Sequence, residues 1–144
     1  MKTLKISGLL LAFFAMFSVN AQEVTDYDLQ NFAHSYIEMM KLNKAAQNDM
    51  AKEIEKSGLE LEVYHAINDT KDSEFIPELE EEEFEKFDKV QPKILKIQSK
   101  LEAEVEKVYA KNDLTKKKYT AIAERVKQDY ILQAKLEKIL ERRR

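Results

Sequence analysis

The sequence predicts an all-α protein, a helical bundle of about four to five helices built from two homologous units with coiled-coil-like seams. Charged residues make up 35% of the chain, while glycine and proline occur only 2 times each, so helix-forming residues dominate and turn residues are rare. Apolar residues recur in alternating steps of three and four, which is the period of helices that pack in bundles. The same frame of residues returns after a constant spacing of 55 positions, which indicates an internal repeat.

The first 21 residues are predicted to form an export signal that is cleaved after Ala21. Lys2 and Lys5 precede an apolar segment at 6–19, and small residues flank the cleavage point. This segment is shorter than the about 20 residues that a membrane-spanning helix needs, although an uncleaved anchor stays open as an alternative. Because the chain contains no cysteine, a lipoprotein, disulfides and thiolate metal sites are not expected. We expect a periplasmic or secreted protein without stable membrane insertion after cleavage.

The first unit spans residues 22–76 and opens with a long helix. Thr25 and Asp28 have the spacing of a capping box at its start. Its seam positions step by three and four: Leu29, Phe32, Tyr36, Met39, Asn43, Ala46 and Met50. The apolar stripe is widened by Ala33, Ile37, Met40 and Ile54. Gly58 is predicted to end the helix in the left-handed conformation, before a shorter helix over 59–69.

The second unit spans residues 77–144, and Pro77 is predicted to lie in the first turn of its long helix. Its seam positions show the same alternation: Phe84, Phe87, Gln91, Ile94, Gln98, Leu101, Val105 and Val108. Pro92 is expected to kink this helix or to restart it. Asp113 stands at the second stop, where it tolerates the left-handed conformation. Thr115 is the predicted N-cap of one last helix, which carries Tyr119, Ile122, Val126, Tyr130, Leu132, Leu136 and Leu140 on its apolar face.

The two units correspond residue by residue at the 55-residue spacing without a gap. Identical pairs are Phe32/Phe87, Lys41/Lys96, Lys52/Lys107, Lys56/Lys111, Leu59/Leu114, Tyr64/Tyr119, Ala66/Ala121 and Ile67/Ile122. Chance agreement between two amphipathic helices is the alternative, but it does not explain the matched turn and the matched tyrosine. We expect the two units to pack their seams together as one domain, because about 60 residues alone are near the lower limit for independent folding.

The residues Phe32-Ala33-His34-Ser35-Tyr36, Ile54 and Gly58-Leu59-x4-Tyr64-x2-Ile67 resemble the pattern of an exported bacterial family known only as domain of unknown function 4168. The first unit has Glu60 where that family usually has Ser or Thr. The second unit lacks the glycine but keeps Thr115, so the resemblance implies two tandem copies, the second one degenerate. It covers most of residues 26–131. It implies a secreted or periplasmic helical protein and brings no catalytic residues.

His34 and His65 are the only 2 histidines, and therefore the first candidates for a metal site. Glu62 and His65 have the Glu-x-x-His spacing of di-iron bundles, but those sites need a second such motif and further inward carboxylates. His34 has Asn31 at the matching position and lies off the seam, and His65 only flanks an inward position. We interpret both histidines as surface residues and predict no catalytic, cofactor-binding or metal-ligating residue.

Three further groups of residues each have two interpretations. Glu80–Glu83 offer carboxylates, but a helical turn scatters four consecutive residues, which favours a solvated face over a cation site. Asn43 and Gln98 occupy equivalent seam positions, where they either fix register as buried amides or lie at the wet edge. A third group could line a groove for unfolded chains, although at helical spacing its members are more often core: Tyr36, Tyr64, Tyr109, Tyr119, Tyr130, Met39, Met40 and Met50.

These observations favour an exported non-catalytic protein that acts by macromolecular interaction in the cell envelope, with an unknown envelope protein as its partner. The alternatives are a periplasmic chaperone-like holdase and, third, a metal-binding protein. Without its signal the chain has 22 basic and 27 acidic residues, so nucleic acid is not expected as a partner. No nucleophile–base pair or phosphate loop can be proposed, which argues against an enzyme. A homodimer stays open, because the seams can close within one chain or between two.

Overall fold

The computed structural model describes residues 23–70, 73 and 77–143. This part of the chain folds into five α-helices and contains no strand, which confirms the predicted all-α class. The helices are α1 (Asp26–Lys56), α2 (Leu61–Thr70), α3 (Glu81–Lys111), α4 (Lys116–Gln128) and α5 (Tyr130–Glu141). The predicted export signal lies outside the described residues. None of the described helices is long and apolar enough to span a bilayer.

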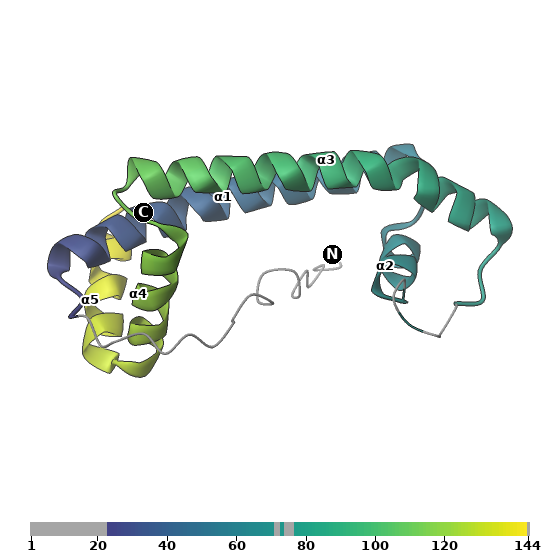
Figure 1. The fold of residues 1–144 in the computed structure, drawn as a ribbon. Helices are drawn as coiled ribbons and strands as arrows, with labels where there is room; N and C mark the ends of the chain where they lie inside the picture. Colours follow the sequence, from purple (N-terminus) through teal and green to yellow (C-terminus); the bar gives the residue numbers. More distant parts are fainter. Residues whose placement is uncertain (1–22, 71–72, 74–76, 144) are drawn as a thin grey trace.

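The two long helices, α1 and α3, run side by side in opposite directions and form a hairpin that extends over most of the molecule (Figure 1). The helix α2 lies at one end of this hairpin, and α4 and α5 lie at the other end, on the same side (Figure 1). Two ion pairs of 3.0 Å, Glu53–Lys93 and Glu38–Lys111, join the long helices toward their opposite ends. The middle of the hairpin is therefore only two helices thick.

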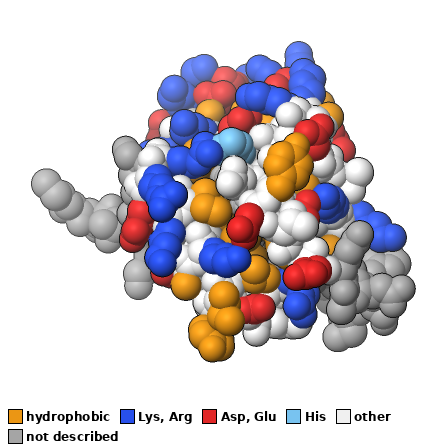
Figure 2. Space-filling view, turned by 90° about the vertical axis from the view of Figure 1, so that its left-hand side faces the viewer, with side chains coloured by type: hydrophobic (Ala, Val, Ile, Leu, Met, Phe, Trp, Pro, Cys, Tyr) orange, Lys and Arg blue, Asp and Glu red, His pale blue; other side chains and the backbone are white. Residues whose placement is uncertain are grey.

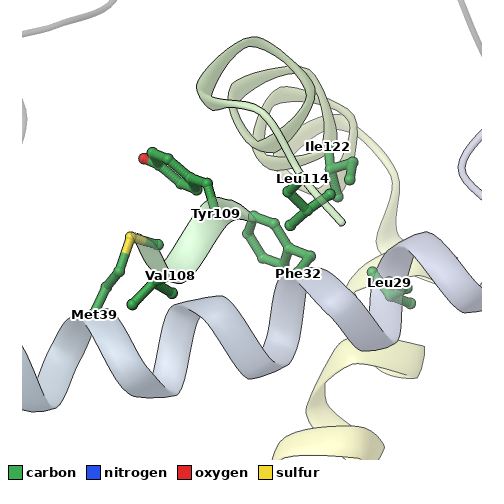
Figure 3. Packing of buried hydrophobic residues seen from close by; sticks show 7 residues of the cluster. All are labelled: Leu29, Phe32, Met39, Val108, Tyr109, Leu114 and Ile122. Atoms are coloured by element: carbon green, nitrogen blue, oxygen red, sulfur yellow. The ribbon is translucent and has the colours of Figure 1, made fainter. Parts of the chain in front are cut away.

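One core, which we call the α4-end core, consists of Leu29, Phe32, Met39, Val108, Tyr109, Leu114 and Ile122. The ring of Phe32 points from α1 toward Leu114 and the start of α4 (Figure 3). It stacks on the ring of Tyr119, with 4.5 Å between the centroids. The helix α5 adds the partly buried side chains of Leu136 and Ile139 to this core. Burial of a side chain as large as Phe32 stabilises the fold by about 1.5–3 kcal/mol.

The other core, which we call the α2-end core, consists of Ile54, Leu59, Tyr64, Ile67, Phe87, Val90 and Ile94. The ring of Tyr64 in α2 packs on Phe87 in α3, with 5.2 Å between the centroids. The hydroxyl of Tyr64 donates a hydrogen bond of 2.8 Å to Oε1 of Gln91. Each core thus joins the long helix of one half of the chain to the turn and short helix of the other half. Neither core is complete within one half.

The helix ends follow the predicted chemistry at four positions. Thr25 and Asp28 form the expected capping box, with a hydrogen bond of 3.1 Å in each direction between backbone N–H and side chain. Gly58 has a φ of 77° and Asp113 a φ of 52°, so both long helices are followed by a left-handed residue. Thr115 caps α4, and its hydroxyl accepts a backbone hydrogen bond of 3.1 Å. Local sequence signals therefore determine where three of the helices begin or end.

The start of α3 differs from the prediction. The helix begins at Glu81 and not at Pro77. The N–H of Glu80 donates a hydrogen bond of 3.0 Å to the carboxylate of Glu83, and this local pairing sets the first helical residue. Of the two expectations for Pro92, the restart is wrong, because α3 continues through it. The N-terminal part of α3 is inclined to the rest of the helix (Figure 1), as a proline that removes one backbone hydrogen bond explains.

The expected single last helix is also wrong, because Asp129 interrupts it. Asp129 is extended, with φ −124° and ψ 105°, and separates α4 from α5. Its carboxylate accepts hydrogen bonds from the N–H groups of Ile131 at 2.9 Å and Leu132 at 3.2 Å, so it caps the second helix. The interruption resets the helical phase. Tyr130, predicted on the apolar face, consequently points out and is 79% exposed.

The predicted seam of α1 is displaced on one flank. Tyr36, a predicted seam residue, is 39% exposed, and Met40 is 56% exposed. Ala33 and Ser35 are instead fully buried, although Ser35 was not expected inside. The helices α4 and α5 also contact α1, and the buried face of α1 is accordingly wider than a heptad seam.

Candidate interaction surfaces

The two histidines lie at different depths. His65 is exposed, as predicted, and its ring meets Tyr64 edge-on at a centroid distance of 5.8 Å. His34 is half-buried, and its buried Nε2 has no hydrogen-bond partner among the described residues, so the predicted surface position is wrong for this residue. Burial lowers the pKa of His34, the guanidinium of Arg143 lowers it further, and Glu38 opposes both effects. The neutral imidazole is therefore favoured at this position.

The residues considered for metal binding do not converge. His34 lies in the first half of α1 and His65 lies in α2, at the other end of the hairpin. In the described ranges, no three His, Asp or Glu side chains are placed to hold a metal ion together. Glu62 is exposed like His65, so the Glu-x-x-His spacing on α2 faces solvent.

The acidic run and the seam amide Asn43 make local contacts within their own helices. Glu80 and Glu83 pair at the start of α3, as described above, and Glu82 forms an ion pair of 2.8 Å with Lys86 one turn later. Asn43 donates a hydrogen bond of 2.9 Å to the carbonyl of Met39 in its own helix. The amide therefore does not bridge to α3, which favours the wet-edge interpretation over the register interpretation.

Most of the tyrosines and methionines considered for a groove are core residues. The residues Tyr64, Tyr109, Tyr119, Met39 and Met50 belong to the two cores or pack against them. Tyr36 and Met40 stay exposed one turn apart on α1, and Tyr130 stays exposed at the start of α5. The exposed members thus belong to two separate places in the fold.

The first of these places is the hairpin ridge, defined by Tyr36, Met40 and Leu95. Met40 in α1 is 56% exposed and Leu95 in α3 is 51% exposed, so each long helix presents a large apolar side chain to solvent. Both lie in the part of the hairpin between the two cores or at its edge. Half-buried apolar residues accompany them along the seam: Leu42, Met50, Ile97, Leu101 and Val105. The hairpin therefore carries apolar surface that no other helix of the described chain fully covers.

The second place is the α4–α5 tip, defined by Asp129, Tyr130 and Ile131. Two consecutive large apolar side chains are exposed here, and Figure 2 shows hydrophobic side chains at the lower extremity of the molecule, where Figure 1 places this connection. The side-chain amide of Gln133 donates hydrogen bonds to the carbonyls of Val126 and Lys127, at 2.9 and 3.1 Å. These bonds tie α5 to the end of α4. The tip is therefore a hydrogen-bonded turn between two helices.

The two ends of the molecule differ in charge. Residues 57–90, which include α2 and the start of α3, contain 12 acidic and 3 basic residues. Residues 112–144, which include α4 and α5, contain 5 acidic and 10 basic residues. Two of these cations pair with α1, because Lys118 contacts Asp28 and Lys135 contacts Asp26 at 2.8 Å. The side-chain interaction with Lys118 lowers the pKa of Asp28.

Comparison with known proteins identifies one family. Residues 25–136 match the family described as Domain of unknown function (DUF4168), and this single match covers both halves of the chain. No curated protein and no solved structure matches the chain.

Proposed function

The chain belongs to the DUF4168 family, and we propose that it is an exported, non-catalytic helical protein that acts in the cell envelope by binding another protein. The signal-like segment at 1–21 motivates export to the periplasm or the medium. The hairpin ridge is the observation that carries the binding role. Large apolar side chains on a two-helix hairpin are the surface that a partner helix covers when it completes a bundle.

The composition of the ridge supports a protein partner. Tyr and Met are enriched at the centres of protein interfaces, and Tyr supplies contact area there at low conformational cost. The ridge is also backed by rigid structure, because Tyr36 lies one turn after Phe32, whose ring it approaches to 6.4 Å. A rigid surface loses little entropy on binding, which favours affinity.

Site-specific photo-crosslinking in cells tests this proposal. We expect a photoreactive residue at Met40 to capture one recurrent envelope protein, and the same residue at Ala45, which is exposed on another side of α1, to capture it weakly. The double substitution Met40→Ser with Leu95→Ser should reduce recovery of that protein by at least about tenfold, and the variant should stay folded. Tyr130→Ser with Ile131→Ser is the matched control. Equal recovery by both double variants would remove the ridge from the binding role.

A holdase is the second candidate function, and the exposure of Tyr36 and Met40 favours it, because adaptable Met surfaces suit varied clients. Suppression of aggregation of a thermally unfolded client by several-fold excess of the mature chain is the measurement. Suppression that disappears with Met40→Ser and Leu95→Ser would place the holdase first. An unchanged aggregation rate of the client at that excess would exclude the holdase function.

We also propose that the matched region consists of two tandem copies, the second one degenerate. Support comes from positions 55 residues apart: Gly58 and Asp113 are both left-handed, and Leu59 and Leu114 are both buried. Exchange of the segments 57–60 and 112–115 within the full chain tests the equivalence. We expect the exchanged chain to fold with a free energy of unfolding within about 1–2 kcal/mol of the original. Loss of folding would show that the two turns are not interchangeable.

A further inference from the structure

We propose that the α4–α5 tip binds an anionic lipid surface. The tip presents Tyr130 at 79% and Ile131 at 54% exposure as consecutive residues at the far end of a helical hairpin. An aromatic ring with a polar hydroxyl beside a branched aliphatic side chain suits the interface between headgroups and acyl chains. This surface differs from the hairpin ridge, so the inference does not depend on the proposed function.

Among the described residues, these two side chains belong to neither core. The next residue, Leu132, is half-buried, and Leu136 and Ile139 pack against the α4-end core. The inner face of α5 is thus anchored, while Tyr130 and Ile131 lie on the outer side of the same first turn. The carboxylate of Asp129 holds this turn by accepting two backbone hydrogen bonds. Binding through Tyr130 and Ile131 therefore does not require the entropy loss of ordering a loop.

The two helices that carry the tip favour contact with an anionic surface, because residues 112–144 contain 10 basic and 5 acidic residues, although the four charged residues at 124–129 balance one another. Arg125 and Lys127 occupy the last turn of α4, next to the tip. The acidic groups there are Glu124, which pairs with Lys127 at 3.3 Å, and Asp129, whose carboxylate is engaged by backbone N–H groups. The rest of α4 and α5 adds further lysines and arginines. Lysine and arginine near an anionic bilayer each add to the attraction, which falls off over a Debye length.

The opposite end of the molecule determines the orientation of binding. The excess of acidic over basic residues in the segment 57–90 repels that end from an anionic surface. The molecule therefore approaches with the α4–α5 tip first and the α2 end away. Such binding is interfacial and reversible, because two side chains give much less anchoring than a spanning helix.

The absence of tryptophan from the sequence provides a direct assay. The full mature chain with Tyr130→Trp carries a single Trp, and we expect its emission to shift to the blue with vesicles of phosphatidylglycerol. Leu95→Trp is the matched control, since Leu95 is also about half exposed but lies on the hairpin ridge, and its emission should not shift. Equal shifts at both positions would overturn the assignment of the tip.

Vesicle flotation then measures the binding itself. The unsubstituted mature chain should float with phosphatidylglycerol vesicles at about 0.05 M salt and be released at about 0.5 M salt. Tyr130→Ser with Ile131→Ser should weaken flotation by about tenfold or more, and Met40→Ser with Leu95→Ser should not. Equal flotation with neutral phosphatidylcholine vesicles would overturn the charge requirement. No flotation, or capture of a protein from position 130 without flotation, would overturn the lipid as the partner.

Discussion

The two ends of the hairpin solve the same packing problem with different means. At each end a phenylalanine of one long helix meets a tyrosine of a short helix, with ring centroids 4.5 Å apart for Phe32 and Tyr119 and 5.2 Å apart for Phe87 and Tyr64. The α2 end adds a polar anchor, because Tyr64 donates a hydrogen bond to Gln91. The α4 end adds a second helix, α5, which contributes apolar area. The comparison shows that the same Phe–Tyr packing can be supplemented either by a hydrogen bond or by a further helix.

The hydroxyls of the two tyrosines sharpen this contrast. Burial raises the pKa of Tyr64, whose hydroxyl nevertheless has an acceptor. Burial, followed by the nearby Tyr109 and Tyr36, raises the pKa of Tyr119 more strongly. The difference predicts that removal of the two hydroxyls has unequal effects.

The largest expected effect comes from the two phenylalanines. Phe32→Ala and Phe87→Ala should each lower the free energy of unfolding by about 3–5 kcal/mol, because each leaves a cavity beside a tyrosine ring. Urea unfolding of the mature chain measures both. Met40→Ala, which changes an exposed side chain, is the control and should cost less than about 0.5 kcal/mol. A loss confined to one of the two phenylalanines would show that the ends do not depend on equivalent cores.

The two left-handed turns give the next effect. Gly58→Ala should cost about 1–2 kcal/mol, because an L residue is strained at a φ of 77°. A Cβ at this position would meet Lys86 Cε at 3.8 Å, an ordinary contact, so the cost is conformational and not steric. Asp113→Gly should be nearly neutral, since it relieves the backbone but removes the acceptor of a 2.8 Å hydrogen bond from Tyr27. Thermal unfolding measures both, and a larger loss for Asp113→Gly would reverse this order.

The tyrosine hydroxyls follow. Tyr64→Phe should cost about 0.5–1.5 kcal/mol, because Gln91 loses its hydrogen-bond donor. Tyr119→Phe should cost less than Tyr64→Phe, because its stability comes from ring contacts that phenylalanine keeps. The pair of variants is measured by urea unfolding under one set of conditions. An equal loss of unfolding free energy in the two variants would contradict the conclusion that only the tyrosine hydroxyl at the α2 end is stabilising.

The smallest effect is a pH dependence at the α4 end. Folding lowers the pKa of His34 below its ordinary value of 6.5, so the unfolded chain binds the proton more tightly than the folded chain. The stabilising contribution is complete above that value and is lost as the pH falls through and below it. His34→Gln should flatten the stability profile between about pH 7 and about pH 5, where Asp and Glu change little. A slope that stays the same in the His34→Gln variant would contradict this assignment.

Short-range signals allowed much of the fold to be predicted. The capping box at Thr25, the left-handed Gly58 and the N-cap at Thr115 depend on residues within one or two turns, so the sequence displays them directly. The start of α3 was misplaced because Pro77 and Glu80 both carry start signals three residues apart, and only their relative strength decides. The break at Asp129 has no glycine or proline beside it. An N-cap residue before an apolar run was the available signal.

Long-range packing explains the remaining errors. His34 and Ser35 lie in a helix that α5, about 100 positions away in the chain, also contacts, and the pattern of α1 alone does not show such a distant contact. The exposure of Tyr130 depends on the phase of a helix whose start was missed. Periodicity placed Tyr36 and Met40 of the hairpin ridge and Tyr130 of the tip inside, whereas it gave Leu95 and Ile131 no place on a predicted apolar face.

The interlocked cores also constrain the order in which the chain can fold. Phe32 lies near the beginning of the chain, but the ring that covers it, Tyr119, lies near the end. Contacts of such long sequence separation are slow to form, since the intervening chain must be closed first. During synthesis, the α4-end core cannot assemble until most of the chain has left the ribosome. A chain that reaches its stable form this late stays unfolded for longer. The proposed export requires this unfolded state.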